Sequence, residues 1–289
     1  MVVWISLPYG LYSLSWTGMT DEIDRLRQEI LRLRKVIRDL SPSLVSLLRT
    51  RGLKIYKKEP RDDLLMPERF IASYYRMLHK YSFRLFLRDV IKFQRGFTIN
   101  DVTRYATKEV TCDYVAYLKR IGLIKEDQNR FVLVRPVKSF GETLEWFFAE
   151  ILKREFLMEA LWGVRFKKPE TNIIPPPSGD FDVIAKFNGS SILYAEVKSS
   201  PPKQIYQKEI KAFLNRIDSL NPELSIFFMD TELRMKDKIV TMFEEELGPH
   251  VERIEKEIFH VGKRLFIMNS KDSITHNIET ILSWYYRNK

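Results

Sequence analysis

Three residues in the second half of the chain, Asp182, Glu196 and Lys198, are of the types that a metal-dependent hydrolytic site uses. Asp182 opens one apolar segment, and Glu196 and Lys198 lie fourteen and sixteen residues further on, at the end of the next segment. Two carboxylates can hold Mg²⁺, a hard cation that takes oxygen ligands and keeps several waters. A lysine can orient a metal-bound water and neutralise the negative charge that develops during hydrolysis. The three residues therefore predict Mg²⁺-assisted hydrolysis, with Mn²⁺ as a substitute for Mg²⁺.

The two apolar segments predict the strands of a β-hairpin, because they flank an Asn-Gly pair typical of tight turns. Side chains alternate along a strand, so Glu196 and Lys198 share one face while the apolar residues between them point to the other. A strict two-residue turn would pair Asp182 with Ala195 and place Asp182 and Glu196 on opposite faces. We therefore predict a three-residue loop that includes Ser190, or a bulge.

This pattern resembles the PD-(D/E)xK nuclease superfamily, which includes restriction endonucleases and archaeal Holliday-junction resolvases. The matching residues are P-P-S-G-D-F-D-V-I-A followed by L-Y-A-E-V-K-S-S, within a core from about Ser139 to Asp230. The resemblance implies that Asp182 and Glu196 hold the metal beside a scissile phosphate and that Lys198 assists the attacking water. It also implies a restriction-endonuclease-like fold. The superfamily includes members that cleave RNA.

Further carboxylates lie close to this motif in the sequence. In many superfamily members the first helix of the core supplies another glutamate, and here that helix offers Glu142, Glu145 and Glu150. Glu145 matches the Gly-x-x-x-Glu pattern of the family, which makes it the predicted fourth catalytic residue and third metal ligand. Its alternative is a solvated helix face. Asp180 competes with Asp182 as a metal ligand. If the strand has already begun at residue 180, the side chains of Asp180 and Asp182 point to the same face of the sheet.

The alternative interpretation of the motif is a surface hairpin that carries ordinary charges, for which a strand ending in Glu-x-Lys is unremarkable. Glu209-Ile210-Lys211 also matches E-x-K, but it lies in a helical pattern with Ala195 at the upstream position. The opening aspartate, the E-x-K on the partner strand, the apolar alternation and the preceding helix occur together here. We therefore favour the catalytic interpretation.

Helices and strands alternate on both sides of the hairpin. The segments are a helix from Gly141 to about Met158, a loop with Pro175-Pro176-Pro177, the hairpin, a helix at 200–220, a buried strand at 224–230, a helix at 234–247, a strand at 263–269 and a helix at 273–288. The order α-β-β-β-α-β with additions predicts an α/β sandwich with a mixed central sheet. Lys203, Gln204 and Lys208, at the start of the second helix, are predicted phosphate contacts.

The net charge of +10 is unevenly distributed. Residues 1–136 hold 26 Lys and Arg against 15 Asp and Glu, whereas residues 137–289 hold 22 against 23. A polyanion-binding module joined to a more neutral one explains this split. A solvated basic face is the alternative, and charge does not by itself decide between the two.

Residues 97–134 predict a short helix, a turn, a longer helix and a hairpin. The short helix opens at Thr98 or Asn100, and the longer helix ends at Gly122. The apolar seam that joins the two helices is predicted to consist of Val102, Tyr105, Val115, Leu118 and Ile121.

This order, with Leu-Lys-Arg-x-Gly-Leu-Ile at the end of the longer helix, resembles winged helix-turn-helix domains. In that family the second helix enters the major groove of DNA. The resemblance therefore implies DNA contacts from Lys108, Thr111, Tyr114 and Lys119 on the longer helix, and from Arg130 on the wing. Such domains also serve as protein-interaction modules, which is the alternative.

A helix is also predicted from Thr20, whose side chain can cap it. Its apolar positions recur with heptad spacing at Ile23, Leu26, Ile30, Leu33, Ile37 and Leu40. The pattern fits a short dimeric coiled coil. It equally fits a helix packed on its own domain, because Leu31 and Val36 widen the apolar stripe.

The composition excludes several classes of protein. A single cysteine, Cys112, rules out an intrachain disulfide and fits a reducing, cytoplasmic compartment. A zinc site is not expected, since the four histidines (His79, His250, His260 and His276) do not fall at ligand spacing. A membrane span is not expected either, because no apolar run reaches the roughly 18 to 20 residues that it needs.

These observations together predict a mostly helical N-terminal half followed by an α/β nuclease-like domain. The predicted parts are a leader without an assigned role (1–19), a helix and basic linker (20–62), a winged-helix nucleic-acid-binding domain (63–136) and a PD-(D/E)xK-like domain (137–289). The expected activity is that of a metal-dependent DNA endonuclease. The alternatives are a non-catalytic DNA-binding protein on a nuclease scaffold, or a nuclease subunit with a helicase or repair partner. A second copy of the same chain, which would form a homodimer, is another expected partner.

Overall fold

The computed structural model describes residues 2–7, 10–39, 41–167, 180–248 and 251–289, with the side chains of 22–36 and of the described residues from 41 onward. The Pro175–Pro177 loop, Gly179 and His250 lie outside the described residues. The chain divides into two compact units, Met1–Ser43 and Leu44–Lys289.

The first unit consists of a hairpin and a long helix. Strands β1 (Val2–Leu7) and β2 (Gly10–Ser15) pair antiparallel, and α1 runs from Trp16 to Asp39. The helix begins four residues before Thr20, so the prediction that Thr20 caps it was wrong. One glycine in a helix costs only about 1 kcal/mol relative to alanine, and Gly18 therefore does not stop the helix.

The second unit is built around a mixed sheet. Within the described residues this sheet has eight strands, in the order β10-β11-β12-β9-β8-β7-β6-β3. Their bounds are β3 (Ile55–Lys57), β6 (Ala160–Phe166), β7 (Phe181–Phe187), β8 (Ser191–Lys198), β9 (Leu224–Met229), β10 (Val251–Glu255), β11 (Ile258–Val261) and β12 (Leu265–Asn269). Strands β8, β9 and β12 run parallel, and the other neighbours pair antiparallel. The predicted α/β architecture with a mixed central sheet is confirmed.

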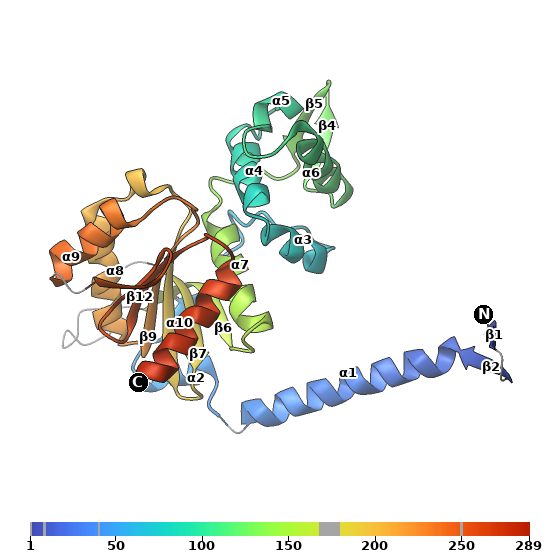
Figure 1. Cartoon of the computed structure of the whole chain (residues 1–289), viewed down its shortest axis with the longest axis horizontal. Coiled ribbons are helices and arrows are strands. Elements are labelled where there is room, and N and C mark those ends of the chain that lie inside the picture. The colour runs from blue at the N-terminus through green and yellow to red at the C-terminus, as the bar shows by residue number, and fades with distance from the viewer. Residues whose placement is uncertain (1, 8–9, 40, 168–179, 249–250) are drawn as a thin grey trace. The chain divides into compact units, whose positions relative to one another are not determined.

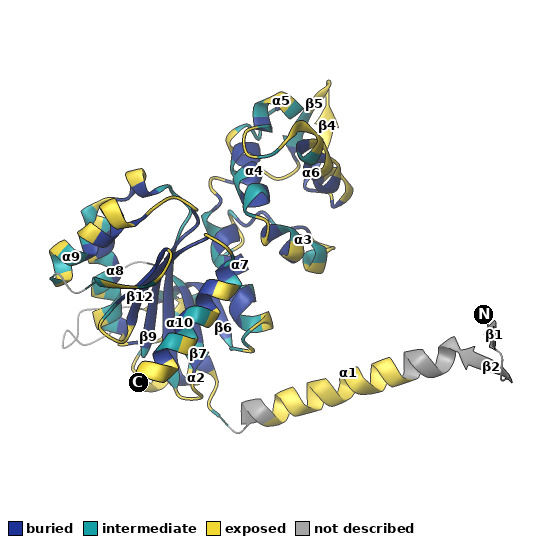
Figure 2. Ribbon diagram, viewed as in Figure 1, coloured by how far each residue is buried: buried dark blue, intermediate teal, exposed yellow. Residues whose placement is uncertain are grey.

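Helices cover both faces of the sheet (Figure 1). Helices α7 (Gly141–Arg154) and α10 (Ile274–Asn288) share one apolar core with Val183 and Ala195. Helices α2 (Leu44–Thr50), α8 (Gln207–Leu220) and α9 (Thr241–Leu247), with the short helices η1 (Pro202–Gln204) and η2 (Lys236–Val240), lie on the other side. There Ile184 and Tyr194 belong to a second apolar core. Because successive side chains of a strand alternate between these cores, the central strands β6, β7, β8, β9 and β12 are buried almost throughout (Figure 2).

The segment at 44–62 was expected to end in a linker, but it is part of the sheet. Strand β3 pairs with β6, and the Glu59 N–H donates to the Trp162 carbonyl at 2.8 Å. The fully buried Leu44 and Leu48 of α2 explain why this basic segment stays attached to the fold.

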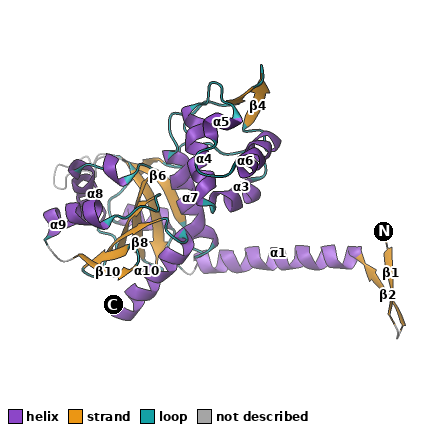
Figure 3. Ribbon diagram, turned by 45° about the horizontal axis from the view of Figure 1, so that its top comes forward, coloured by secondary structure: helices purple, strands orange, loops and turns teal. Residues whose placement is uncertain are grey.

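The helical part contains the predicted elements between residues 97 and 134. Helices α3 (Ile71–Leu78) and α4 (Tyr81–Lys92) precede the short α5 (Ile99–Val102), the longer α6 (Lys108–Arg120) and the hairpin of β4 (Ile124–Asp127) and β5 (Arg130–Leu133) (Figure 3). Four residues of the predicted seam are buried, but Tyr105 is 44% exposed and does not belong to it.

A buried ion pair connects this helical part with the sheet. Arg84 on α4 and Asp230, directly after β9, are both buried, and Nη2 of Arg84 lies 2.8 Å from Oδ1 of Asp230. Arg88 contacts the same carboxylate. Burial alone would raise the pKa of Asp230, but the two guanidinium groups outweigh it and hold the pKa below its usual value. The same apolar core also runs from α3 through α7 into the sheet.

In the described part of the chain, none of the helices is both long enough and apolar enough to span a membrane.

Candidate active site

The hairpin β7–β8 has the register that the catalytic interpretation requires. Phe187 pairs with Ser191, and Val183 pairs with Ala195. The loop between the strands therefore has three residues and includes Ser190, which confirms the predicted loop. One step further in the same register, Asp182 stands opposite Glu196, so the two carboxylates lie on the same face of the sheet.

Glu196 is the most buried carboxylate of this region, at 1% exposure, and each of its oxygens has partners. Lys198 donates to Oε1 at 2.7 Å, and Nη1 of Arg216 lies 3.0 Å from both oxygens. The Tyr194 hydroxyl donates to Oε2. The negative charge of Glu196 is thus compensated by two cations and a hydroxyl, which is what a buried carboxylate requires.

Lys198 lies at the edge of the buried region. Burial alone would lower the pKa of Lys198, but Glu196 and Asp182 outweigh this effect and raise it above its ordinary value. The ammonium therefore keeps its proton at neutral pH. It can neutralise developing negative charge or orient a water.

Asp182 accepts a hydrogen bond from the backbone N–H of Val197 at 2.7 Å, which fixes its carboxyl group across the two strands. Burial raises the pKa of Asp182 to about 7, and the nearby Glu196 adds to the rise. Lys198 opposes the rise only in part. Near neutral pH this carboxyl group therefore changes its charge readily, and a further cation would stabilise the ionised form.

Glu145 reaches the same place from α7. Burial raises its pKa well above the usual range, and Asp182 is the second cause. On β6 the residue opposite Asp182 is Gly163, since Trp162 pairs with Val183 and Val164 with Phe181. A Cβ atom at Gly163 would lie 3.6 Å from Oε2 of Glu145. A helix and two strands thus bring three carboxylates, those of Glu145, Asp182 and Glu196, towards one another.

The competing carboxylates are engaged elsewhere. Oδ1 of Asp180 lies 2.5 Å from Nε of Arg165, which makes Asp180 part of an ion pair with β6. Glu142 accepts from the backbone N–H of Asp63 at 2.9 Å, and Glu150 accepts from Arg154 at 2.7 Å. These partners favour Asp182 over Asp180 and Glu145 over its neighbours on α7.

The donor chemistry of this cluster fits a hard divalent cation. Among the described residues, no group of three or more His, Cys, Asp or Glu side chains is arranged to hold a metal ion. Mg²⁺, however, is commonly bound through one or two carboxylates and several waters. Glu145 and Asp182 are two such carboxylates. The negative charge of Asp182 contributes to the raised pKa of Glu145, and a bound cation would relieve this repulsion.

Arg216 was not among the residues selected from the sequence. It lies on α8, three residues after the buried Phe213 and four before the buried Leu220. This spacing places it in the stripe of the helix that faces the sheet. An arginine within an apolar stripe is the signal that could have identified it, since charged side chains in such positions are almost always paired.

The predicted nucleic-acid contacts divide into two groups. The first group consists of exposed residues, namely Lys108, Lys119, Arg130, Lys203 and Gln204. Thr111 and Tyr114, in contrast, are buried at 1% and 4% exposure. The ring of Tyr114 packs 5.0 Å from that of Phe83, and its hydroxyl pairs with Ser82 at 2.9 Å. The prediction for these two residues was wrong, because they lie on the core-facing side of α6.

The exposed face of α6 carries both signs of charge. Glu109 and Asp113 are exposed on the same helix as Lys108 and Lys119, and Lys119 pairs with Glu126 at 2.7 Å. With Arg120, which is also exposed, the surface of α6 carries three cations and two carboxylates.

An exposed aromatic residue lies at the start of α8. Tyr206 is 60% exposed, and the ammonium groups of Lys208 and Lys238 each lie 5.8 Å from the centre of its ring. Its backbone N–H donates to Glu209, whose charge also acts on Lys198. The start of α8 thus lies near the carboxylate cluster.

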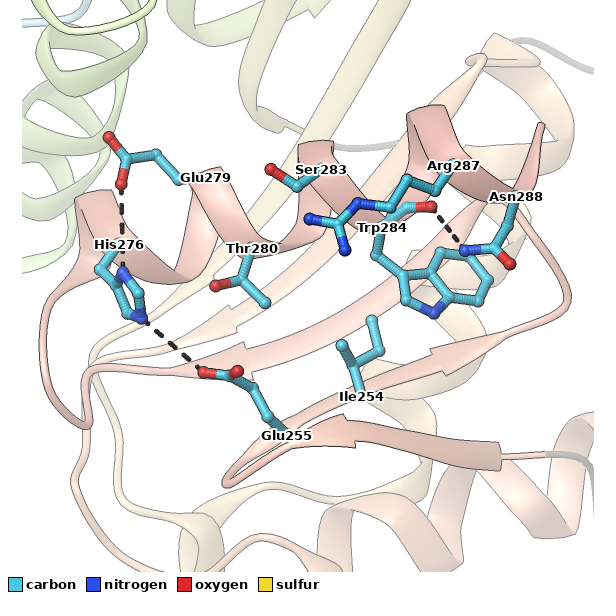
Figure 4. Close-up of a pocket in the computed structure, with 9 residues that line it drawn as sticks. All are labelled: Ile254, Glu255, His276, Glu279, Thr280, Ser283, Trp284, Arg287 and Asn288. Atoms are coloured by element: carbon cyan, nitrogen blue, oxygen red, sulfur yellow. Dashed lines mark hydrogen bonds and ion pairs between the residues drawn. The ribbon is translucent and has the colours of Figure 1, made fainter.

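A pocket lies along α10 beside β10, away from these residues (Figure 4). The imidazole of His276 stands between Glu255 and Glu279, with nitrogen–oxygen distances of 3.7 and 4.0 Å. None of the residues of the carboxylate cluster lines this pocket.

Comparisons with protein-family models and with curated proteins found no match for this chain. Among solved structures, a similar one is that of protein VC1899 from Vibrio cholerae, with 11% sequence identity and a TM-score of 0.47. The similarity covers 86% of this chain and 62% of VC1899, so the chain spans less than two thirds of that protein. A similarity of this size assigns neither a family nor an activity to the chain.

Proposed function

We propose that this chain is a metal-dependent DNA endonuclease of the PD-(D/E)xK type, with Asp182, Glu196, Lys198 and Glu145 as its active site. The observation that carries the proposal is the register of β7 and β8, which sets Asp182 opposite Glu196 with Lys198 on the same face. A surface hairpin with ordinary charges would not need a fully buried carboxylate, Glu196, beside the half-buried carboxylates of Asp182 and Glu145.

In this proposal each residue has a separate role. Asp182 and Glu145 would hold Mg²⁺ or Mn²⁺, with Glu196 as the third carboxylate of the site. The bound cation would supply a water of lowered pKa and stabilise negative charge on the phosphate. Lys198 would hold that water and neutralise charge, a role supported by its raised pKa. Arg216 would position Glu196 through its two contacts of 3.0 Å.

The helical part would deliver the substrate. The sequence α5, α6 and the β4–β5 hairpin has the order of a winged helix-turn-helix domain, and the N-terminal half holds the basic excess of the chain. With Thr111 and Tyr114 buried, the remaining candidates are Lys108, Lys119 and Arg130. Near the carboxylate cluster, Lys203, Gln204 and Tyr206 would contact the strand to be cut.

One observation favours a second candidate function, a DNA-binding protein that uses the nuclease fold only as a scaffold. The Glu196 carboxylate is already compensated by Lys198 and Arg216. A carboxylate held by two cations has less negative charge to offer a metal.

A cleavage assay separates the two functions. Plasmid and branched DNA are incubated with Mg²⁺, Mn²⁺ or EDTA, with the wild type, Asp182→Ala and Lys198→Ala, and with Asp180→Ala as the matched control. We expect cleavage that requires a divalent cation, is lost in the first two variants and persists in the control. Unchanged cleavage in both Asp182→Ala and Lys198→Ala contradicts the proposed active site. Metal-independent DNA binding without cleavage by the wild type supports the scaffold function.

A further inference from the structure

The first helix of the chain exposes a regular row of large apolar side chains. Ile23, Leu26, Ile30 and Leu33 are 42%, 54%, 49% and 48% exposed. They recur at intervals of three, four and three residues along α1, and the described part of this helix is exposed all round (Figure 2). Exposed apolar residues that form a continuous stripe, unlike scattered ones, mark an interaction surface.

The order of residue types along this row indicates the partner. With Ile23 and Ile30 at the first position of the heptad, Leu26 and Leu33 occupy the fourth position. Isoleucine at the first and leucine at the fourth position favour two-stranded parallel coiled coils, because these side chains pack best in the holes of a dimer. The partner that this row fits is therefore another helix of the same pattern.

The charges beside the row select a second copy of the same helix. Glu22 and Glu29 directly precede the two isoleucines, and Arg27 and Arg34 directly follow the two leucines. In a parallel dimer in register, Glu22 faces Arg27 of the second copy, and Glu29 faces Arg34 of the second copy. An antiparallel dimer would set glutamate against glutamate and arginine against arginine. The charge pattern is thus self-complementary only in the parallel arrangement.

The ion pairs already present within α1 do not prevent this pairing. Glu22 lies 3.9 Å from Arg25, and Glu29 lies 2.9 Å from Arg32, each three residues further along the same helix. The side chains of these pairs are 48% to 82% exposed, and such pairs contribute little to stability. The glutamates can therefore exchange these partners for the arginines of a second helix.

We propose that α1 pairs with α1 of a second copy in a parallel two-stranded coiled coil and makes this protein a homodimer. The pairing is independent of the proposed nuclease activity, since none of the residues of α1 belongs to the carboxylate cluster.

The first test is sedimentation equilibrium of the full-length chain at micromolar concentrations. We expect the wild type to have twice the mass of one chain and Ile30→Lys to have the mass of a single chain. Leu31→Lys is the matched control, because Leu31 is 63% exposed and lies outside the row. It introduces the same charge one residue away, and the dimer should persist. A monomeric wild type, or a dimer that survives Ile30→Lys, overturns the proposal.

The second test exchanges the charges. The double variants R27E/R34E and E22R/E29R should each be monomeric, and their mixture should restore the dimer. Both carry changes only on exposed helix positions, so a folding defect is not expected, and circular dichroism of each variant checks this. A mixture that stays monomeric contradicts the proposed pairing.

The third test measures orientation by disulfide cross-linking in a Cys112→Ser background, since Cys112 is exposed. In a parallel dimer Leu26→Cys should form an intermolecular disulfide on mild oxidation, because residue 26 faces residue 26 of the second copy. Gln28→Cys, on the outer side of the helix, should form much less. Equal cross-linking at both positions excludes the parallel arrangement, and a helix packed on its own chain would give none.

Discussion

Arg216 of α8 places Nη1 at 3.0 Å from both carboxylate oxygens of Glu196 on β8. The contact joins a helix that covers the sheet to the strand that carries the E-x-K residues. Since Glu196 is 1% exposed, this guanidinium is one of the two cations that make its burial tolerable.

Arg216→Ala should therefore destabilise the fold. Removing one partner of a buried ion pair costs about 3 to 5 kcal/mol. Because Lys198 and Tyr194 still contact Glu196, we expect a loss of about 2 kcal/mol in the free energy of unfolding. Urea denaturation measures it. Arg234→Ala, which removes an arginine that is 62% exposed in its pair with Asp237, is the control and should cost less than about 0.5 kcal/mol. Equal losses in the two variants contradict the importance of the Arg216 contact.

The raised pKa of Asp182 makes stability depend on pH when no divalent cation is present. The pKa of this carboxyl rises on folding from an ordinary value of 3.8 to about 7, so the folded state binds the proton more tightly than the unfolded state. The resulting stabilisation is fully present below the unfolded pKa and is lost as pH rises through the folded one. Asp182→Asn removes this titration. In EDTA, raising the pH from 5 to 8 should therefore lower the free energy of unfolding of the wild type more than that of this variant. If the difference in the free energy of unfolding between the variant and the wild type is the same at pH 5 and pH 8, the pKa of Asp182 is not raised.

Mg²⁺ should stabilise the wild type at pH 8, where Asp182 is ionised. A ligand that binds only the folded state at ten times its Kd adds about 1.4 kcal/mol to the free energy of unfolding. Asp182→Asn should remove this gain, and Asp180→Asn should retain it, because Asp180 is paired with Arg165. Thermal or urea unfolding with and without Mg²⁺ measures the gain. The same response in both variants would mean that the cation binds elsewhere.

Gly163 allows β6 to pass close to the segment before the helical part. Its φ of +55° lies in the left-handed region, and an added Cβ would come within 2.4 Å of Cδ of Pro60. Gly163→Ala should cost about 1 kcal/mol for the backbone conformation and about 1 to 3 kcal/mol more for the contact. Gly262→Ala is a matched control, since its φ is +56° and open space surrounds its Cβ position. Urea denaturation measures both losses of stability. If the two variants lose the same free energy of unfolding, Pro60 moves away from the added Cβ without an energetic penalty, and the predicted cost of the contact is wrong.

Tyr206 should contribute to binding of single-stranded DNA if the proposed nuclease function is right. Stacking of one base on an exposed aromatic ring is worth about 1 to 3 kcal/mol, so Tyr206→Ala should weaken binding at least about fivefold. Tyr206→Phe keeps the ring and should bind like the wild type. Fluorescence anisotropy with a labelled oligonucleotide, at fixed salt, measures both. Equal affinities for Ala and Phe variants argue against stacking.

The sequence was sufficient to predict the features that depend on spacing along one strand. Glu196 and Lys198 share a face because two residues separate them, and the loop that brings Asp182 opposite Glu196 followed from the same alternation. Apolar periodicity and turn residues also marked the helices α7, α8 and α10 and the strands β9 and β12. Strands β3, β10 and β11 at the sheet edges, and the position of β6, were not predicted from the sequence.

Features that depend on the rotation of a helix against its neighbours were not accessible. Arg216 was missed because its partner lies twenty residues earlier, on a strand whose position relative to α8 is set by tertiary packing. The family pattern predicted that Thr111 and Tyr114 lie on the exposed side of α6, whereas both side chains are buried in the core. Tyr105 was assigned to the seam that joins the two helices, yet it lies just outside the short α5 and is exposed.

The buried pair of Arg84 and Asp230, together with the apolar core shared by α3, α7 and the sheet, has a consequence for how the chain can be divided. A cut near residue 136 would expose one face of this core on each fragment and leave a charge without its partner. Residues 44–289 should therefore melt in one cooperative transition, and neither half should be transferable as an independent module to another protein. If the helical part binds DNA as proposed, its specificity would then have to be exchanged by substitutions on its surface, and not by replacement of that part.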